Sequence, residues 1–325
     1  MLDIYIKKAI IHQFLPTETE LVISDKYLNL TPKIEAYLRK KIERVYSDQA
    51  KTGVFETENA FLSRLTDDLK ETSREVAQAW KDVFTLSENQ KTNDLVFIEF
   101  ESHGVKHFAF LRLALRENLA HLGQDFDNPI TTTQNNLPGP GSPPDEALIV
   151  NLKTRQYFLI EKRIKHNGAF LNYFSDQILA VKPDISVQKS IKTMEQTAQK
   201  IAANFNQDDF QFQSKVKTAL YKHLQEEEVL SAEKLADQLF DQNLTAKLSF
   251  IDQVKETLPQ SLPIEQLDTS RQLKKLENQK LSLSNGIELI VPNRVYEDAE
   301  SVEFIQNEDG TYSILIKNIE AIEAK

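Results

Sequence analysis

The sequence concentrates cationic side chains in residues 151–200. This segment holds nine lysines and arginines against four acids, a net charge of +5, whereas the whole chain carries −10. Such cations bind the phosphate backbone of a nucleic acid, and an acidic chain can do so only where its positive charge is gathered on one surface. We expect phosphate contacts from eight of these residues, the basic set: Lys153, Arg155, Lys162, Arg163, Lys165, Lys189, Lys192 and Lys200.

The spacing after Ser186 predicts an amphipathic helix that displays part of this set. At about 100° per residue, Lys189, Lys192 and Lys200 fall on one face together with Gln196. One side would pack while the other offers ammonium groups, although a lysine-rich face is also typical of a helix that is simply solvated. The apolar face consists of Val187, Ile191, Met194, Ala198, Ile201 and Phe205.

Three more members of the set lie in residues 162–168, with the sequence Lys-Arg-Ile-Lys-His-Asn-Gly. We interpret this segment as a basic turn between a strand and a helix over 169–179. Its glycine permits close approach of the backbone, and the amides at a helix start add phosphate contacts.

A competing chemistry is metal binding by Glu99, Glu101, His103 and His107. On a strand the two glutamates project to the same face, and two carboxylates with two imidazoles suit a hard or borderline metal ion. The other interpretation of these residues is a solvated strand face with a polar turn. A metal-dependent enzyme is therefore kept as an alternative function.

Other catalytic motifs are absent from the sequence. It has no cysteine, no phosphate-cradling glycine loop, no histidine pair around a helical glutamate and no Gly-x-Ser-x-Gly elbow. These absences exclude disulfides, thiolate metal sites and the common motif-bearing enzyme classes. We predict a non-enzymatic protein without a cofactor or a bound metal.

The elements before residue 122 follow no regular βαβ order, which favours an α+β domain. Strand patterns at 3–14 and 21–23 predict an opening hairpin, and a second hairpin spans 95–111. Between them Thr31-Pro32 predicts a helix start, with threonine as N-cap and proline in the first turn. Apolar spacings predict two further helices, at 61–69 and 76–84.

Residues 123–145 interrupt this pattern with five of the chain's eleven prolines. Such a composition favours a loop or linker. We therefore divide the chain into an N-terminal α+β domain at 1–122, a Pro/Gly-rich loop or linker at 123–145 and a C-terminal α+β domain at 146–325. A long insertion inside one domain is the alternative.

The C-terminal domain is predicted to be a helical region that ends in β-hairpins. The hairpins are expected at Asn285-Gly286 and Asp309-Gly310, because these dipeptides are the strongest short-range hairpin signals. The expected elements are strands at 147–152 and 156–160, helices at 186–205, 208–227 and 231–242, and hairpins at 281–291 and 302–316.

The cellular compartment is suggested by what the chain lacks. No apolar run approaches the roughly 18 residues that a membrane-spanning helix needs, and the N-terminus lacks the basic-then-apolar order of a secretion signal. We expect a cytoplasmic protein that does not enter a membrane.

Short stretches spread along the chain carry a family resemblance. They are Ile-x-x-Ala-Ile-Ile-His at 6–12 with Glu-Leu-Val-Ile-Ser-Asp at 20–25, Val45-Tyr46 with Gly53-Val54-Phe55, the segments 155–159 and 168–174, and 268–276 with the hairpin after it. In order and spacing over roughly residues 1–320 they resemble the NdpA-type 37-kilodalton family of bacterial nucleoid-associated proteins. The resemblance implies an acidic cytoplasmic protein that associates with the nucleoid and binds DNA, without an established catalytic signature. Residues 123–145 depart from the family pattern.

Charge and resemblance together predict a nucleoid-associated protein that binds double-stranded DNA with little sequence preference through the basic set. RNA is a further polyanion for the same chemistry, and a homodimer would double a modest basic surface. The alternative is a protein–protein adaptor. It would use the remainder of the chain, which carries −15 outside residues 151–200, to engage basic proteins bound to the chromosome.

Overall fold

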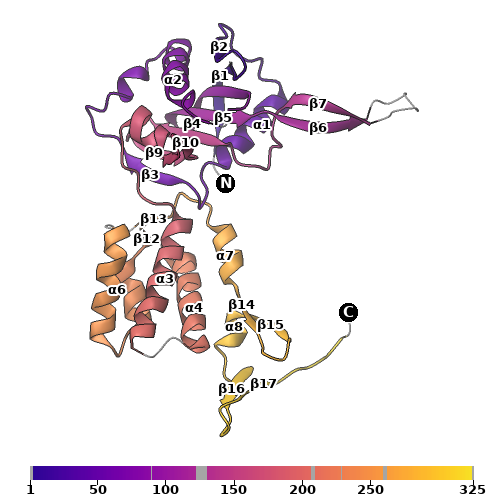
Figure 1. The fold of residues 1–325 in the computed structure, drawn as a ribbon, viewed down its shortest axis with the longest axis vertical. Helices are drawn as coiled ribbons and strands as arrows, with labels where there is room; N and C mark the ends of the chain where they lie inside the picture. The colour runs from indigo at the N-terminus through magenta and orange to yellow at the C-terminus, as the bar shows by residue number, and fades with distance from the viewer. Residues whose placement is uncertain are drawn as a thin grey trace. The chain divides into compact units, whose positions relative to one another are not determined.

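The chain folds into two compact units, Met1–Ser186 and Val187–Lys325 (Figure 1). Both units combine helices with antiparallel strands, so the predicted α+β class is confirmed. The computed structural model describes residues 3–88, 90–121, 130–205, 209–227, 229–258 and 262–323.

A seven-stranded antiparallel sheet organises the first unit. Its strands are β1 (Tyr5–Leu15), β2 (Glu20–Val22), β3 (Lys51–Val54), β4 (Asn93–Ser102), β5 (Val105–Ala114), β8 (Glu146–Asn151) and β9 (Gln156–Ile160). They lie in the order β2-β1-β4-β5-β8-β9-β3. The pairing of β1 with β2 and of β4 with β5 confirms both predicted N-terminal hairpins.

The strands β8 and β9 decide where this unit ends. β8 pairs with β5, and β9 pairs with β8 and β3, so both strands complete the N-terminal sheet. The division of the chain after Ser186 therefore differs from the boundary that we expected at 123–145. A strand pattern in the sequence does not say which strand will be its partner, and here the partners set the boundary.

Residues 123–145 lie inside the first unit, between β5 and β8. β6 (Arg116–His121) and β7 (Ile130–Asn136) form a two-stranded hairpin, and residues 122–129 are outside the described part of the chain. Figure 1 shows this hairpin projecting from the body of the unit. The expected irregular structure is thus wrong for residues 130–136, where strand pairing overrides the effect of the nearby prolines.

Two α-helices belong to the described residues of the first unit, α1 (Pro32–Glu43) and α2 (Leu69–Phe84). The side chain of Thr31 caps α1 by accepting a hydrogen bond from the Ile34 N–H, as predicted. Asp68 caps α2 through the Lys70 N–H. Because this cap starts α2 at Leu69, the helix predicted at 61–69 is reduced to the 3₁₀ turn η1 (Leu62–Arg64).

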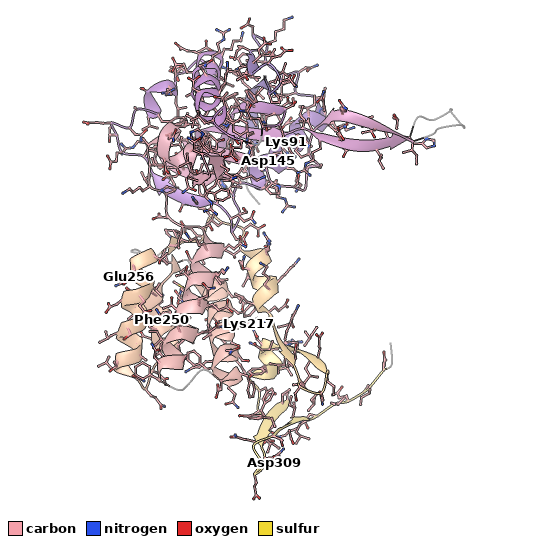
Figure 2. The ribbon with its side chains drawn as sticks, in the orientation of Figure 1. Lys91, Asp145, Lys217, Phe250, Glu256 and Asp309 are labelled. Carbon is pink, nitrogen blue, oxygen red and sulfur yellow. The ribbon has the colours of Figure 1, made fainter. Side chains whose placement is uncertain are left out.

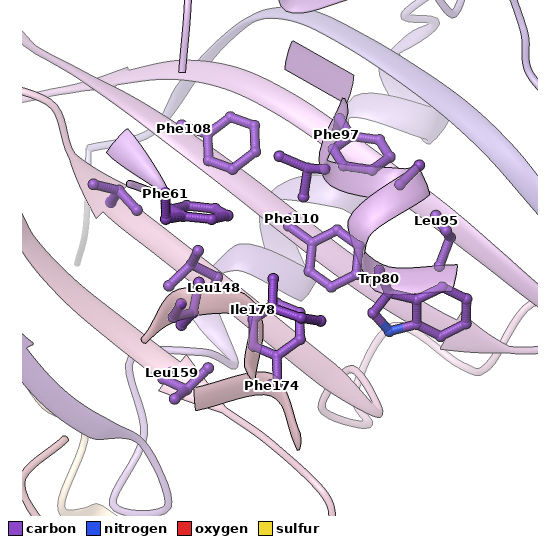
Figure 3. Packing of buried hydrophobic residues seen from close by; sticks show 14 of the residues in the cluster. Phe61, Trp80, Leu95, Phe97, Phe108, Phe110, Leu148, Leu159, Phe174 and Ile178 are labelled. Carbon is purple, nitrogen blue, oxygen red and sulfur yellow. The ribbon is translucent and has the colours of Figure 1, made fainter. Parts of the chain in front are cut away.

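Aromatic side chains fill the core between the sheet, α2 and the π-helical turn η2 (Phe174–Leu179) (Figure 3). Trp80 of α2 is fully buried, as its apolar stripe predicts, and stacks on Phe84 with ring centroids 4.2 Å apart. Phe110 of β5 stacks on Phe174 at 5.3 Å. Each buried ring removes about 150–250 Å² of surface from water, so this layer holds α2 and η2 on the sheet.

A β-hairpin begins where a helix was predicted over 169–179. β10 (Ile164–His166) pairs with β11 (Ala169–Leu171) around Asn167-Gly168, whose φ angles are 50° and 78°. Two left-handed residues in succession make a turn that matches the twist of paired strands. The helix prediction was wrong for residues 169–171, because a short apolar run suits a strand as well as a helix. Residues 174–179 are helical as predicted, in the π-helical turn η2. Because strand β11 follows Gly168, no helix start lies here to supply the backbone amides that were expected to contact phosphate.

Gly53 of β3 is expected to tolerate no side chain. It pairs with Tyr157 of β9, and a Cβ at this position would lie 2.3 Å from the Tyr157 hydroxyl oxygen. Gly53→Ala should displace this buried ring and lower the free energy of unfolding by about 1–3 kcal/mol. Urea unfolding followed by Trp80 fluorescence measures the change. Gly141→Ala, where a Cβ meets no atom within 4 Å, is the matched control. Equal stability of the two variants would refute the expected clash.

The second unit has a helical body followed by hairpins. Its helices are α3 (Val187–Asn204), α4 (Phe210–Glu226), α5 (Ala232–Leu239), α6 (Leu244–Thr257), α7 (Ser270–Leu276) and α8 (Asn293–Tyr296). Its strand pairs are β12 (Val229–Leu230) with β13 (Leu262–Pro263), β14 (Asn278–Ser282) with β15 (Glu288–Pro292), and β16 (Val302–Gln306) with β17 (Tyr312–Ile316).

The helices of this unit pack against one another. α3 and α5 each pack on α4 and α6, and α7 packs on α4. The two C-terminal hairpins turn where predicted, with Gly286 at φ 87° and Gly310 at φ 82°. In the described ranges of the whole chain, no helix has the length and apolar character needed to cross a bilayer.

Candidate nucleic-acid interface

The exposed face of α3 carries three members of the basic set, as predicted. Lys189, Lys192 and Lys200 are exposed together with Gln196. Lys200 Nζ donates a 3.3 Å hydrogen bond to Gln253 Oε1 of α6, which leaves the lysine charge unneutralised. The opposite stripe is buried except at its end, where Phe205 is partly exposed. Its buried members are Val187, Ile191, Met194, Ala198 and Ile201.

Lys153 and Arg155 lie in the turn between β8 and β9. Lys153 is exposed and forms no ion pair with the residues that the structure describes. Arg155 adopts a φ of 63°, a backbone conformation that is uncommon for a residue other than glycine. Its guanidinium donates a hydrogen bond to the Thr57 hydroxyl, a neutral partner. Both side chains therefore keep an uncompensated positive charge.

Lys162 and Lys165 are each paired with a carboxylate. Lys162 Nζ lies 2.6 Å from Asp145 Oδ1 (Asp145 is labelled in Figure 2), and Lys165 Nζ lies 3.1 Å from Glu88 Oε2. Burial raises the pKa of Asp145, but the hydrogen bonds from Lys162 and the backbone outweigh it and leave the pKa below its usual value. The hydrogen bond from Lys165 lowers the pKa of Glu88. Both carboxylates stay ionised and offset these two lysines, which their spacing in the sequence did not reveal.

Arg163 forms an exposed stack with Phe170. The guanidinium carbon lies 5.3 Å from the centroid of the Phe170 ring, and Phe170 is 62% exposed. The ring holds the planar guanidinium by a cation–π interaction without cancelling its charge. Arg163 is therefore a positioned cation at the base of the β10–β11 hairpin.

The basic set is divided between the two units. Residues 153–165 belong to the first unit and residues 189–200 to the second. Each group is therefore an interface on its own packed body. Within the first unit, the members of the basic set whose charge is not offset by a carboxylate in the described part of the chain are Lys153, Arg155 and Arg163.

The four residues of the metal hypothesis are not brought together. Glu99 and Glu101 share a face of β4, but His107 pairs directly with Phe100 and so lies on the other face. Its ring stacks on Phe100 with centroids 5.0 Å apart, and Lys106 Nζ lies 3.3 Å from Glu99. Within the ranges described above, no group of three histidine, aspartate or glutamate residues has an arrangement that could hold a metal ion. The alternation of faces along one strand was used correctly for the two glutamates, but the register that pairs His107 with Phe100 could not be deduced from it.

A further group of exposed cations lies outside the basic set, in residues 271–280 on α7 and β14. This group was not predicted from the sequence, because the density of positive charge is highest in residues 151–200. The signal that could have found it is the helical spacing of Arg271, Lys274 and Lys275, which are separated by three and four residues.

Comparison with known proteins identifies the family to which the chain belongs. No curated protein matches it. A family model described as nucleoid-associated protein YejK matches residues 10–323, which include most of both units, and confirms the resemblance seen in the sequence. The chain therefore belongs to the family of nucleoid-associated protein YejK.

Proposed function

We propose that this protein binds double-stranded DNA at the bacterial nucleoid, in the cytoplasm, with little sequence preference. Membership of a nucleoid-associated family carries the proposal. The exposed cations of α3 and of the β8–β9 turn supply the chemistry, because phosphate contacts dominate non-specific affinity. Phosphate contacts position a protein on a duplex without reading its sequence.

The ion pairs indicate which members of the basic set contribute most to binding phosphate. Lys162 and Lys165 already have carboxylate partners and contribute less than the sequence suggested. The other six members of the basic set, of which Lys189 also has an interaction within the chain, correspond to roughly four to six neutralised phosphates. They are Lys153, Arg155, Arg163, Lys189, Lys192 and Lys200. This is a modest number, and binding should be correspondingly sensitive to salt.

Affinity for duplex DNA is expected to fall steeply with salt. For this number of contacts, log K should decrease with log salt with a slope of about −4 to −5, a loss of roughly 10²- to 10³-fold between 50 and 200 mM. Fluorescence anisotropy with two labelled duplexes of unrelated sequence measures the slope, which should be the same for both. A flat salt response, or strong preference for one duplex, would contradict the proposal.

Matched variants test the residues themselves. Lys192→Gln/Lys200→Gln should make the slope less negative by about 2, because each lost phosphate contact removes about 0.9. The control Lys26→Gln/Lys33→Gln removes the same charge at exposed positions outside the basic set and should leave the slope near that of the wild type. Equal slopes for the two variants would exclude the α3 face.

A second candidate function is the protein–protein adaptor. It is favoured by the C-terminal segment 297–323, which holds eight acids and one lysine. Lys317, that single lysine, is paired with Glu303. Such a segment suits a basic protein bound to the chromosome. Recovery of partners after DNase and RNase treatment supports the adaptor, and loss of recovery after DNase alone supports direct binding to DNA.

A further inference from the structure

Four exposed cations lie on α7 and on the strand that follows it. Arg271, Lys274 and Lys275 lie within about 100° of arc on α7, opposite the buried side chains of Gln272 and Leu276. Lys280 is exposed on β14, on the face away from buried Gln279. We name these four cations the α7–β14 strip. Glu277 is the one acid in residues 270–282, so the local net charge is +3.

The strip has no counterions in the part of the chain that the structure describes. None of its four residues forms an ion pair or a side-chain hydrogen bond there. Lysines on the neighbouring helices do have partners. Lys222 of α4 lies 2.7 Å from Glu297. The fold therefore neutralises some surface lysines of this unit, whereas the strip, like Lys192 and Lys200 on α3, has no carboxylate partner among the described residues.

A buried polar network fixes the strip on a rigid support. Gln279 Nε2 donates to Asn293 Oδ1 at 2.9 Å, to Thr218 Oγ1 at 3.1 Å and to the Ser214 carbonyl at 3.2 Å. Asn293 Nδ2 donates to the Leu276 carbonyl at 2.7 Å, which ties the end of α7 to α8. Satisfied buried networks specify one arrangement of the elements they join. The network therefore holds α7 and β14, which carry the cations, in one arrangement relative to α4 and α8.

Like charges meet at one end of the strip. Lys217 of α4 (Figure 2) donates a hydrogen bond to the Asn278 carbonyl, the residue at the start of β14. Burial lowers the pKa of Lys217, Glu195 opposes this effect, and the nearby charge of Lys280 lowers it again. Lys280 therefore adds positive potential to a region that already contains a partly buried ammonium group. An anion bound there would relieve this repulsion.

We propose that Arg271, Lys274, Lys275 and Lys280 form a second binding surface for the phosphodiester backbone of DNA, separate from the basic set. The inference rests on the proposed DNA-binding function and adds a site to it. The rise from Arg271 to Lys275 along a helix is about 6 Å, and each strand of a duplex carries one phosphate per about 3.4 Å of the duplex axis. The cations of α7 therefore extend far enough to contact more than one phosphate.

The four cations of the α7–β14 strip should steepen the salt dependence of DNA binding by the full chain. Four further phosphate contacts add about −3.6 to the salt slope, so the wild-type value should approach about −8 rather than the −4 to −5 of the basic set alone. The variant Arg271→Gln/Lys274→Gln/Lys275→Gln/Lys280→Gln should return the slope to that lower value. Its affinity at 100 mM salt should fall at least tenfold for every duplex sequence.

Two controls separate charge from folding. Lys8→Gln/Lys26→Gln/Lys33→Gln/Lys40→Gln removes four exposed cations from the first unit and should change the slope by less than 1. Arg271→Lys/Lys274→Arg/Lys275→Arg/Lys280→Arg keeps the charges and should bind within about twofold of the wild type. A neutralised strip that binds like the first control overturns the inference and leaves the proposed function standing. A wild-type chain that does not bind DNA overturns both.

Discussion

Replacing Arg112 with methionine is expected to lower the free energy of unfolding of the first unit by about 3–5 kcal/mol. Arg112 Nε donates to Glu146 Oε2 at 2.9 Å, and both side chains are almost inaccessible to water. Removing the guanidinium would leave the Glu146 carboxylate charged, buried and without its counterion. Desolvation of such a carboxylate costs several kcal/mol.

The remaining partners of Glu146 cannot replace the arginine. Tyr173 donates its hydroxyl to Glu146 Oε2, and Trp80 Nε1 lies 3.3 Å from the same oxygen. Burial, with Glu146 as the next cause, raises the pKa of Tyr173 well above 10 and keeps its proton in place. Both groups are neutral donors, so neither supplies a positive charge.

The single tryptophan of the chain reports this change directly. Trp80 contacts Glu146, so its fluorescence during urea unfolding follows the first unit without interference from the second. Arg112→Met/Glu146→Leu, which removes both charges, should recover most of the lost stability. A loss below about 1 kcal/mol for Arg112→Met, or a double variant weaker than the single one, would show that the pair is not the main source of stability here.

Replacing Lys41 with methionine is expected to cost about 2–4 kcal/mol and to release the loop at 137–145. Lys41 Nζ donates to the carbonyls of Gly139 and Ser142, each at 2.8 Å, and to Ser142 Oγ at 3.2 Å. Methionine keeps the apolar stem but leaves these acceptors without their charged donor. Urea unfolding and the rate of proteolysis within the loop measure the two effects. Lys40→Met, on the exposed side of the same helix, should change stability by less than about 1 kcal/mol.

The lowered pKa of Lys41 predicts that the free energy of unfolding depends on pH. Burial, with Arg116 as the next cause, lowers the pKa of Lys41 to about 8, against 10.5 in an unfolded chain. Between these values the unfolded state binds more protons, so the free energy of unfolding contributed by this group rises with pH. The difference in stability between wild type and Lys41→Met should increase from pH 7.5 to pH 10. A constant difference would mean that Lys41 keeps its usual pKa in the folded chain.

Local patterns predicted several elements correctly. The periodicity from Val187 to Ile201 identified α3 and its exposed lysines, because helix geometry places residues three and four apart on one face. Thr31-Pro32 marked the start of α1, and Asn285-Gly286 marked a hairpin, because both depend on the conformations open to neighbouring residues. The basic character of residues 151–200 and the family resemblance were likewise readable from residue types alone.

Contacts between distant residues could not be predicted in this way. The partners of Lys162, Arg112 and Lys41 lie on other elements, and a sequence pattern does not encode which strand will be adjacent. That pairing placed β8 and β9 in the N-terminal sheet and His107 on the face opposite Glu99. Short-range sterics and periodicity are therefore sufficient for helices, caps and turns. Which charges are neutralised, which stay free for phosphate and where one unit ends depend on long-range packing, and the tertiary structure alone decides them.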